Sequence, residues 1–300
     1  MAGRVANSVR SLLTILKPMG SRTDAFLAHL HRTLSTSAGV ESLITTVCFT
    51  AIFVHARLRY LLERQYERLA VAMATNASKS MLPGEILMAE IEPPQTRLAE
   101  LCASVKTLAD VMQDYWIFFR LWGLVGIYNS ARENYLKPPG DAPLKLLTWV
   151  HVATGATFQL LENGAYLASK GILRGEKWTR RESKWAVWSN RFWLAQVLVD
   201  GLRLLRVRQL RYKEEFGAKE AGEVNAKELK IQSEALRRKW QRDAYANAGW
   251  LPVTLHWSFE DENNSPVNDT CLGLGGMIPG VIGLLDAWEE TSDSRTLVQP

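Results

Sequence analysis

The chain contains 300 residues, of which 47% are hydrophobic, and its formal net charge is +5. This composition lies at the apolar end of soluble proteins and below that of carriers with many membrane spans. The three cysteines are an odd number, widely spaced, and each lies in an apolar stretch. That usage predicts buried, reduced thiols and argues against a secreted protein stabilised by disulfides.

The first 75 residues are predicted to form N-terminal amphipathic helices. Met1–Gly20 carries three basic residues and no acid, which is also typical of a mitochondrial transit peptide. Ser42–Ala56 has no formally charged residue, and its apolar stripe lies opposite serine and threonine. Such a helix either inserts shallowly between lipid headgroups or packs in the core of a bundle. The residues predicted to insert into a membrane are Leu43, Ile44, Val47, Phe49, Ile52 and Phe53.

A linker is predicted over 76–95, which contains three prolines and a glycine, and an apolar and basic helical core over 96–216. The core begins with a helix predicted over 98–112, whose apolar residues follow the helical period. Two apolar segments follow, Asp114–Tyr128 and Leu144–Lys170, separated by a proline-rich turn. Because proline cannot continue a helix, the two segments are predicted to form a helical hairpin with Asp141 as the cap of its second helix. Helices this apolar are buried either in a large core or in lipid.

The chain has eleven tryptophans, and most lie near the ends of apolar segments. Tryptophan favours the boundary between membrane and water, because its ring is apolar and its N–H needs a partner. The alternative is that these large side chains fill a protein core. Arg120 lies inside the first arm of the hairpin, where a charge is costly at the centre of a bilayer.

The stretch from Lys170 to Lys213 carries twelve basic and three acidic residues, a net charge of +9. A helix is predicted over about 179–216, with tryptophan and other apolar residues on one face and arginines on the rest. Either nucleic acid or anionic lipid could bind such a patch. No zinc-ligand spacing or other nucleic-acid motif accompanies it, so a membrane surface is favoured and no nucleic-acid partner is expected. The residues predicted to contact lipid headgroups are Arg174, Lys177, Arg180, Arg181 and Lys184.

A highly charged helix is predicted over 217–245, and a C-terminal apolar hairpin and tail over 246–300. Ala244–Phe259 and Thr270–Leu285 are free of formal charge, but each is about 16 residues long, whereas a membrane span needs about 20. Both are therefore marginal spans, and a glycine-rich loop is the alternative for the second. Its glycines suit close helix packing and predict self-association through Gly273, Gly276, Gly280 and Gly283.

No catalytic or metal-binding pattern occurs in the sequence. The five histidines have no cysteine or acid at a metal-ligand spacing, and no phosphate-binding loop or nucleophile motif is present. His29 and His31 are predicted at the surface. His151 and Glu162 lie on one apolar helix, where a polar pair in a packed core is favoured over a catalytic dyad. The chain is predicted not to be an enzyme, with no catalytic residue, no metal and no cofactor.

Five stretches resemble the peroxin-eleven family, and most closely its fungal C-type or animal gamma-like branch. The resemblance runs in order over most of the chain, and LLENGAYLASKG (160–171) is its most specific part. The five stretches are DYWIFFRLWGLVGIY (114–128), GATFQLLENGAYLASKGIL (155–173), WSNRFWLAQV (188–197), LPVTLHWSFE (251–260) and GLGGMIPGVIGLLDAW (273–288).

The resemblance implies a peroxisomal membrane protein that elongates, constricts and multiplies peroxisomes. It also implies a lipid bilayer with anionic phospholipids as partner, oligomers with itself or related family members, contact with the fission machinery, and no cofactor. The expected fold is all-α, a membrane-associated helical bundle with apolar hairpins, amphipathic helices and no sheet. The family's membrane-inserting helix matches 24–58, but Glu41 is followed here by Ser42 where the family tends to carry lysine, which weakens attraction to anionic lipid.

Two other functions fit parts of the sequence. The acid-free start favours a mitochondrial membrane scaffold, which is the main alternative. A soluble helical adaptor that uses the helices over 179–245 is the second alternative, and it predicts release from membranes at high salt, because screening weakens attraction between exposed charges.

Overall fold

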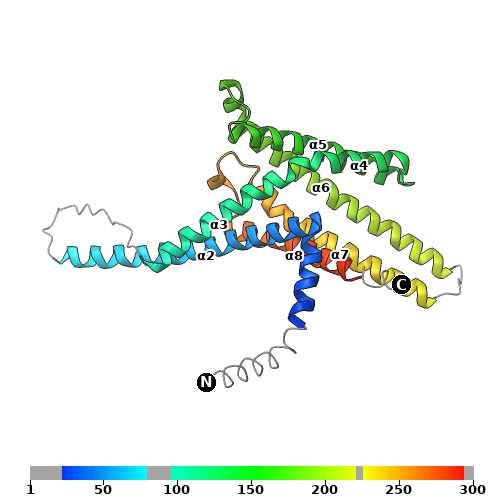
Figure 1. Cartoon of the computed structure of the whole chain (residues 1–300), viewed down its shortest axis with the longest axis horizontal. Helices are drawn as coiled ribbons and strands as arrows, with labels where there is room; N and C mark the ends of the chain where they lie inside the picture. Colours follow the sequence, from blue (N-terminus) through cyan, green and yellow to red (C-terminus); the bar gives the residue numbers. More distant parts are fainter. Residues whose placement is uncertain (1–21, 80–95, 221–225, 294–300) are drawn as a thin grey trace, which may run out of the picture. The chain divides into compact units, whose positions relative to one another are not determined.

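The computed structural model describes residues 22–79, 96–220 and 226–293 (Figure 1). The predicted N-terminal helix over 1–20 and nearly all of the predicted linker lie outside these ranges. The described residues form helices joined by turns and contain no strand, which confirms the all-α prediction. They divide into two compact units, one made of the residues up to Leu43 and from Gly280 onwards, and the other of Ile44–Pro279.

The first unit begins with a helix over 22–34, which stops just before helix α2 (Ser37–Ser78). Helix α2 begins directly after Thr36, which caps it. Its hydroxyl accepts a hydrogen bond from the backbone N–H of Gly39 at 3.0 Å. Gly39 is needed for this turn, since a Cβ there would lie 2.1 Å from the carbonyl oxygen of Thr33.

His29 anchors the helix over 22–34 to the end of helix α8 (Asp269–Asp293) within the same unit. Its ring lies 3.7 Å from the Trp288 ring, centroid to centroid. Its Nε2 lies 3.0 Å from the Trp288 carbonyl oxygen and 3.2 Å from the Thr291 hydroxyl. The surface prediction is therefore wrong for His29, which is half-buried, and correct for His31, which is exposed.

Helices α2 and α8 also approach closely in the second unit, through small residues of α8. A Cβ on Gly273 would lie 2.6 Å from the backbone nitrogen of Phe53, and a Cβ on Gly276 would lie 2.2 Å from the ring of Phe49. Only glycine allows this separation, because any side chain at these positions would overlap α2. The glycine-rich stretch is therefore a packed helix and not a loop.

Helix α3 (Arg97–Phe119) begins at Thr96, whose hydroxyl accepts a hydrogen bond from the backbone of Ala99. The first predicted hairpin arm is interrupted in the structure. A 3₁₀ turn over Arg120–Trp122 separates α3 from helix α4 (Gly123–Leu136). This tighter turn begins at Arg120, the basic residue of the arm.

Helix α5 (Ala142–Ser169) forms the second arm, and Asp141 caps it as predicted. The Asp141 carboxylate accepts a hydrogen bond from the backbone N–H of Leu144 at 2.9 Å. It also accepts two hydrogen bonds from Arg206, at 3.0 and 2.7 Å, which tie the start of α5 to helix α6. The helix ends before Gly171, whose φ of 68° suits glycine.

Helix α6 (Glu176–Glu220) packs along α5 and against helix α7 (Ala226–His256). The indole N–H of Trp240 on α7 donates a hydrogen bond to the carbonyl oxygen of Leu204 on α6 at 2.8 Å. The predicted helix over 179–216 is thus confirmed with slightly longer bounds.

The charge-free stretch Ala244–Phe259 continues the charged helix and does not form a separate one. Helix α7 therefore runs across the predicted boundary at residue 245. It meets α8 through a reciprocal contact of glycine and proline. A Cβ on Gly249 would lie 2.8 Å from Cδ of Pro279, and a Cβ on Gly275 would lie 2.5 Å from Cγ of Pro252.

Aromatic rings from five helices form the core of the second unit. The ring centroids of Trp193 and Trp250 lie 5.1 Å apart, and those of Trp116 and Trp250 lie 5.9 Å apart. Phe49 of α2 and Trp257, in the turn that follows α7, meet at 5.9 Å. Four tryptophans from α3, α6, α7 and this turn therefore fill a core, as the alternative interpretation of the tryptophans predicted.

Other tryptophans are exposed, so the boundary interpretation applies to only part of the set. Trp116 is 2% exposed, whereas Trp122 is 71% and Trp188 is 51% exposed. The cysteine prediction is also partly wrong. Cys48 and Cys102 are buried, but the side chain of Cys271 is exposed.

The cap of α5 predicts a pH-dependent stability. The hydrogen bonds from Arg206 and from the backbone of Leu144 lower the pKa of Asp141 from 3.8 to about 2. A lowered carboxyl pKa stabilises the folded state above pH 3.8, and this contribution is lost as the pH falls through about 2. Asp141→Asn keeps a capping oxygen but removes the charge. We expect it to lower the melting temperature at pH 7 and to have little effect at pH 2, measured by circular dichroism in detergent.

Asp141→Ala serves as the comparison, because it removes the cap as well as the charge. It should lower the melting temperature more than Asp141→Asn at pH 7 and should still lower it at pH 2. An equal effect of Asp141→Asn at both pH values would show that the ion pair with Arg206 adds no stability.

The close approach of α8 to α2 predicts a cost for Gly276→Ala. The added methyl group would overlap the ring of Phe49, and overpacking of this kind costs about 1–3 kcal/mol. Gly126→Ala in α4 is the control, because a Cβ on Gly126 would meet nothing within 4 Å. Removing a helical glycine there should stabilise the protein by about 0.5–1 kcal/mol. Thermal unfolding in detergent measures the melting temperature of both variants, and equal changes in the two would contradict the packing of α8 against α2.

Candidate membrane-contact surface

Two helices in the described residues are long and apolar enough to cross a membrane, Ser37–Ser78 and Asp269–Ser292. The evidence is their length and composition, which a core helix of a soluble protein can share. They contain the charge-free stretches that begin at Ser42 and Thr270. The stretch that begins at Ala244 does not meet the same criteria.

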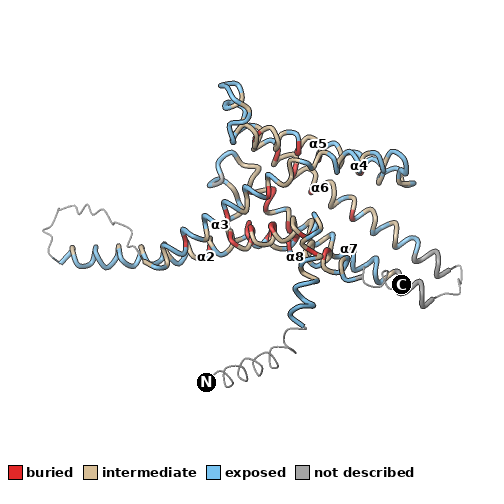
Figure 2. Tube along the Cα trace, in the orientation of Figure 1, coloured by how far each residue is buried: buried red, intermediate tan, exposed pale blue. Residues whose placement is uncertain are grey.

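The six residues predicted to insert lie along α2 and differ in exposure. Ile44 and Phe49 are buried, and Phe49 is fully enclosed in the aromatic core. The other four side chains are half-buried. Figure 2 shows that burial on α2 is concentrated in its first half and that the second half is largely exposed. In this conformation the half-buried residues are the ones available to lipid, and insertion stays a prediction.

The four glycines predicted to mediate self-association contribute to packing inside the chain. Gly273, Gly276 and Gly280 are buried, and Gly283 is half-buried. A Cβ on Gly283 would lie 2.5 Å from the hydroxyl oxygen of Ser42. Their small size thus serves contact between α8 and α2, and self-association through them stays a prediction.

All five residues predicted to contact lipid headgroups are exposed, at the end of the α5–α6 turn and on the first turns of α6. Arg180 forms an exposed ion pair with Glu176. Lys177 and Arg181 lie 5.6 and 6.0 Å from the ring of Trp178. Exposed positive charges beside an aromatic ring suit the interface of an anionic membrane.

An exposed apolar stripe on α3 was missed in the sequence. Its residues occur at intervals of 7, 3, 4 and 3, the spacing of a helix-pairing seam, and the buried residues of α3 lie on a different face. The stripe consists of Leu101, Leu108, Val111, Tyr115 and Phe118. The helical period predicted over 98–112 combined residues of the exposed face with residues of the buried face. The spacing of the large residues at intervals of three and four could have distinguished the two faces.

Arg120 is enclosed by the aromatic core and is paired there. Its guanidinium carbon lies 3.7 Å from the centroid of the Trp116 ring and 5.3 Å from that of Trp193. It also forms an ion pair with Glu162 of α5, and the two side chains are only 13% and 11% exposed. Burial raises the pKa of Glu162, and the positive charge of Arg120 opposes that shift.

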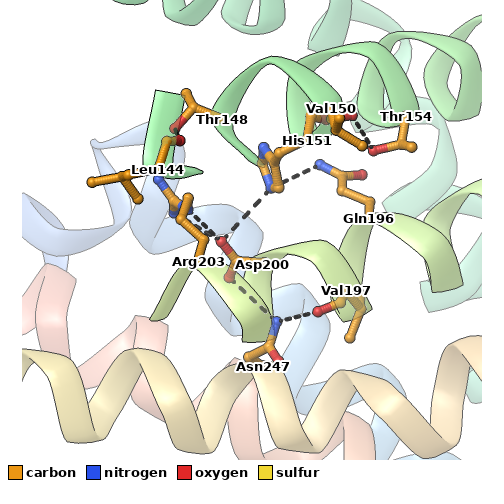
Figure 3. A network of polar contacts seen from close by, with 10 residues as sticks. All are labelled: Leu144, Thr148, Val150, His151, Thr154, Gln196, Val197, Asp200, Arg203 and Asn247. Atoms are coloured by element: carbon orange, nitrogen blue, oxygen red, sulfur yellow. Dashed lines mark hydrogen bonds and ion pairs between the residues drawn. The ribbon is translucent and has the colours of Figure 1, made fainter. Parts of the chain in front are cut away.

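Glu162 is thus paired with Arg120, and His151 belongs to a different polar cluster (Figure 3). The His151 Nε2 lies 3.3 Å from the Gln196 amide nitrogen and 3.9 Å from Asp200 Oδ1. Burial lowers the pKa of His151, so the ring is neutral at pH 7 and the contact with Asp200 is polar, not ionic. The predicted pairing of His151 with Glu162 is therefore wrong.

The His151 cluster links three helices. Asp200 of α6 accepts hydrogen bonds from Arg203 at 2.9 Å and from Asn247 of α7 at 3.2 Å. Asn247 also donates to the carbonyl oxygen of Val197 at 3.0 Å. These contacts hold α5, α6 and α7 together. Among the described residues, no group of three or more histidine, cysteine or acidic side chains is placed to hold a metal ion.

The family model of peroxisomal biogenesis factor 11 (PEX11) matches residues 93–288. The match covers more than half of the chain and includes all five stretches that carry the resemblance. It confirms the predicted family, which is one of biogenesis factors and not of enzymes, and it does not address the branch. No curated protein and no solved structure matches the chain.

The enclosed ion pair predicts a large loss of stability for Glu162→Gln. Removing one partner of a buried pair leaves the other charge uncompensated, which costs about 3–5 kcal/mol. Asp110→Asn is the matched control, because it removes the same charge from an ion pair with Lys106 whose side chains are 60% and 58% exposed. It should cost less than about 1 kcal/mol. Denaturant unfolding in detergent distinguishes them.

Adding Arg120→Met to Glu162→Gln should recover much of the lost stability, because no unpaired charge then remains in the core. If Glu162→Gln and Asp110→Asn lower the free energy of unfolding by the same amount, the charge of Arg120 does not depend on Glu162 for compensation.

Proposed function

Because the chain belongs to the peroxisomal biogenesis factor 11 family, we propose that it is a peroxisomal membrane protein that controls peroxisome elongation, fission and number. The family match over 93–288 carries this proposal. The two apolar helices α2 and α8 support the membrane location. The peroxisomal family also favours this function over a mitochondrial scaffold.

We propose that α2 acts as a wedge in the cytosolic leaflet. A helix that buries an apolar face among the headgroups expands one leaflet relative to the other and so bends the membrane. The half-buried side chains of α2 that support this role include Val47 and Ile52. Contact of Phe49 and Phe53 with α8 fixes how α2 is turned about its axis, so the orientation of the wedge follows from protein packing.

The exposed basic residues at the start of α6 support attachment to anionic phospholipid. Each lysine or arginine near an anionic surface contributes about 1 kcal/mol at moderate salt. Five such residues, Arg174, Lys177, Arg180, Arg181 and Lys184, supply the attraction that the weakly basic α2 segment lacks.

Self-association concentrates curvature by bringing several wedges together. The glycines of α8 already pack inside the chain, so the exposed α3 stripe is the better candidate for contact with a second copy or a related family member. Contact with the fission machinery belongs to the same proposal.

The wedge is tested with Val47→Glu and Ile52→Glu combined. Burial of carboxylates in the apolar part of a leaflet is strongly unfavourable, so insertion should be lost. In cells that lack the natural protein, we expect the variant to leave peroxisomes as few and as enlarged as an empty vector does. Peroxisome number and length are counted by fluorescence microscopy.

Val71→Glu is the control, because Val71 lies on the same helix and is 66% exposed. It should restore peroxisome number as the unaltered protein does. Circular dichroism and carbonate extraction of membranes should show that both variants fold and stay in the membrane. Normal number and length with the Val47 and Ile52 variant would remove the wedge role.

A further inference from the structure

A groove of about 330 Å³ lies between α6 and α7, apart from the surfaces described above. Helices α6 and α7 run side by side in Figure 1, and hydrogen bonds between them fix the walls of the groove. Three arginines line it, together with one acid, two aromatic rings, a serine and a glutamine: Arg208, Arg211, Arg237, Glu234, Tyr212, Trp240, Ser233 and Gln241. The charged lining residues give a net charge of +2.

Contacts within the protein hold two of these arginines in place. The Arg208 guanidinium carbon lies 4.8 Å from the Trp240 ring centroid, and its Nη2 donates a hydrogen bond to the Tyr212 hydroxyl at 3.1 Å. Arg211 donates through Nη1 to the carbonyl oxygen of Leu236 at 2.8 Å. Each guanidinium has five N–H groups, so donors are left over for a ligand.

None of the three arginines forms an ion pair within the described part of the chain. Three positive charges that converge on one groove repel one another and favour an anion between them. Arginine binds phosphate oxygens in a bidentate manner, and an adjacent ring and hydroxyl suit a polar ring attached to that phosphate. The volume also falls in the range of small-ligand sites.

We propose that this groove binds a phosphate monoester on a membrane lipid, such as the headgroup of a phosphorylated phosphatidylinositol. Arg211 and Arg237 hold the phosphate from the two helices. Trp240 and Arg208 form one wall for the inositol ring. The choice of lipid as the source of the phosphate rests on the proposed membrane function, whereas the anion site itself rests on the groove.

The full-length protein in nonionic detergent is titrated calorimetrically with short-chain phosphatidylinositol phosphate, with the unphosphorylated lipid, and with free inositol bisphosphate. We expect the phosphorylated lipid and the free headgroup to bind and the unphosphorylated lipid not to bind. Arg211→Gln with Arg237→Gln should weaken headgroup binding by about tenfold or more, since charge-assisted bidentate contacts are lost.

Arg238→Gln with Lys239→Gln is the matched control. It removes the same charge from the same region of α7, at exposed residues that do not line the groove. It should weaken binding less than about twofold, as expected for screened surface charge. Should the groove variant lose helicity, Arg237→Lys replaces it, because lysine keeps the charge but not the planar fork, and it should still weaken binding severalfold.

If both double variants weaken headgroup binding equally, the groove is not the binding site, because the headgroup then binds to surface charge alone. Failure of the phosphorylated lipid to bind, or tighter binding of a phosphorylated peptide, would overturn the lipid assignment. If the phosphorylated lipid does not bind but peroxisome number in cells is normal, the proposed function stands and only the assignment of the groove as a lipid site is rejected.

Discussion

The second unit depends on one enclosed charge. Arg120 lies against the rings of Trp116 and Trp193, and it is compensated by a carboxylate from the facing helix. An arginine so placed must keep both partners, since its charge can neither leave the core nor be neutralised by deprotonation. This requirement fixes the position of α3 relative to α5 and α6, and α7 completes the aromatic enclosure through Trp250. The helix itself adapts by forming a 3₁₀ turn where the charge enters the core.

Much of the fold could be predicted from the sequence because local rules decide it. The cap at Asp141, the long basic helix α6 and the absence of a sheet from the described residues follow from turn chemistry and from periodicity. The partners of buried polar groups could not be predicted this way. His151 and Glu162 share one helix, but each pairs with a residue far away in the sequence, Gln196 and Arg120. Spacing along a helix does not report which neighbouring helix supplies a partner.

The candidate site was predictable only in part, for a related reason. Hydropathy identifies an apolar residue but does not say whether protein or lipid covers it. Phe49 and Val47 have the same apolar character, yet one is enclosed by tryptophans and the other is half-buried. The exposed stripe of α3 was not recognised because each buried residue, Cys102, Ala109 and Trp116, directly follows a stripe residue, so that the two faces alternate closely along the sequence. The basic residues at the start of α6 were easier to place, since long charged side chains are rarely buried.

The crossing of α7 and α8 has a consequence for how the protein tolerates its surroundings. Gly249 and Gly275 bring two backbones together, and Pro252 and Pro279 fill the space that each opposite glycine leaves. Such a contact includes van der Waals attraction from close atomic fit, which does not require the hydrophobic effect and therefore persists in hydrocarbon. The crossing should therefore keep one shape whether water or hydrocarbon surrounds the helices.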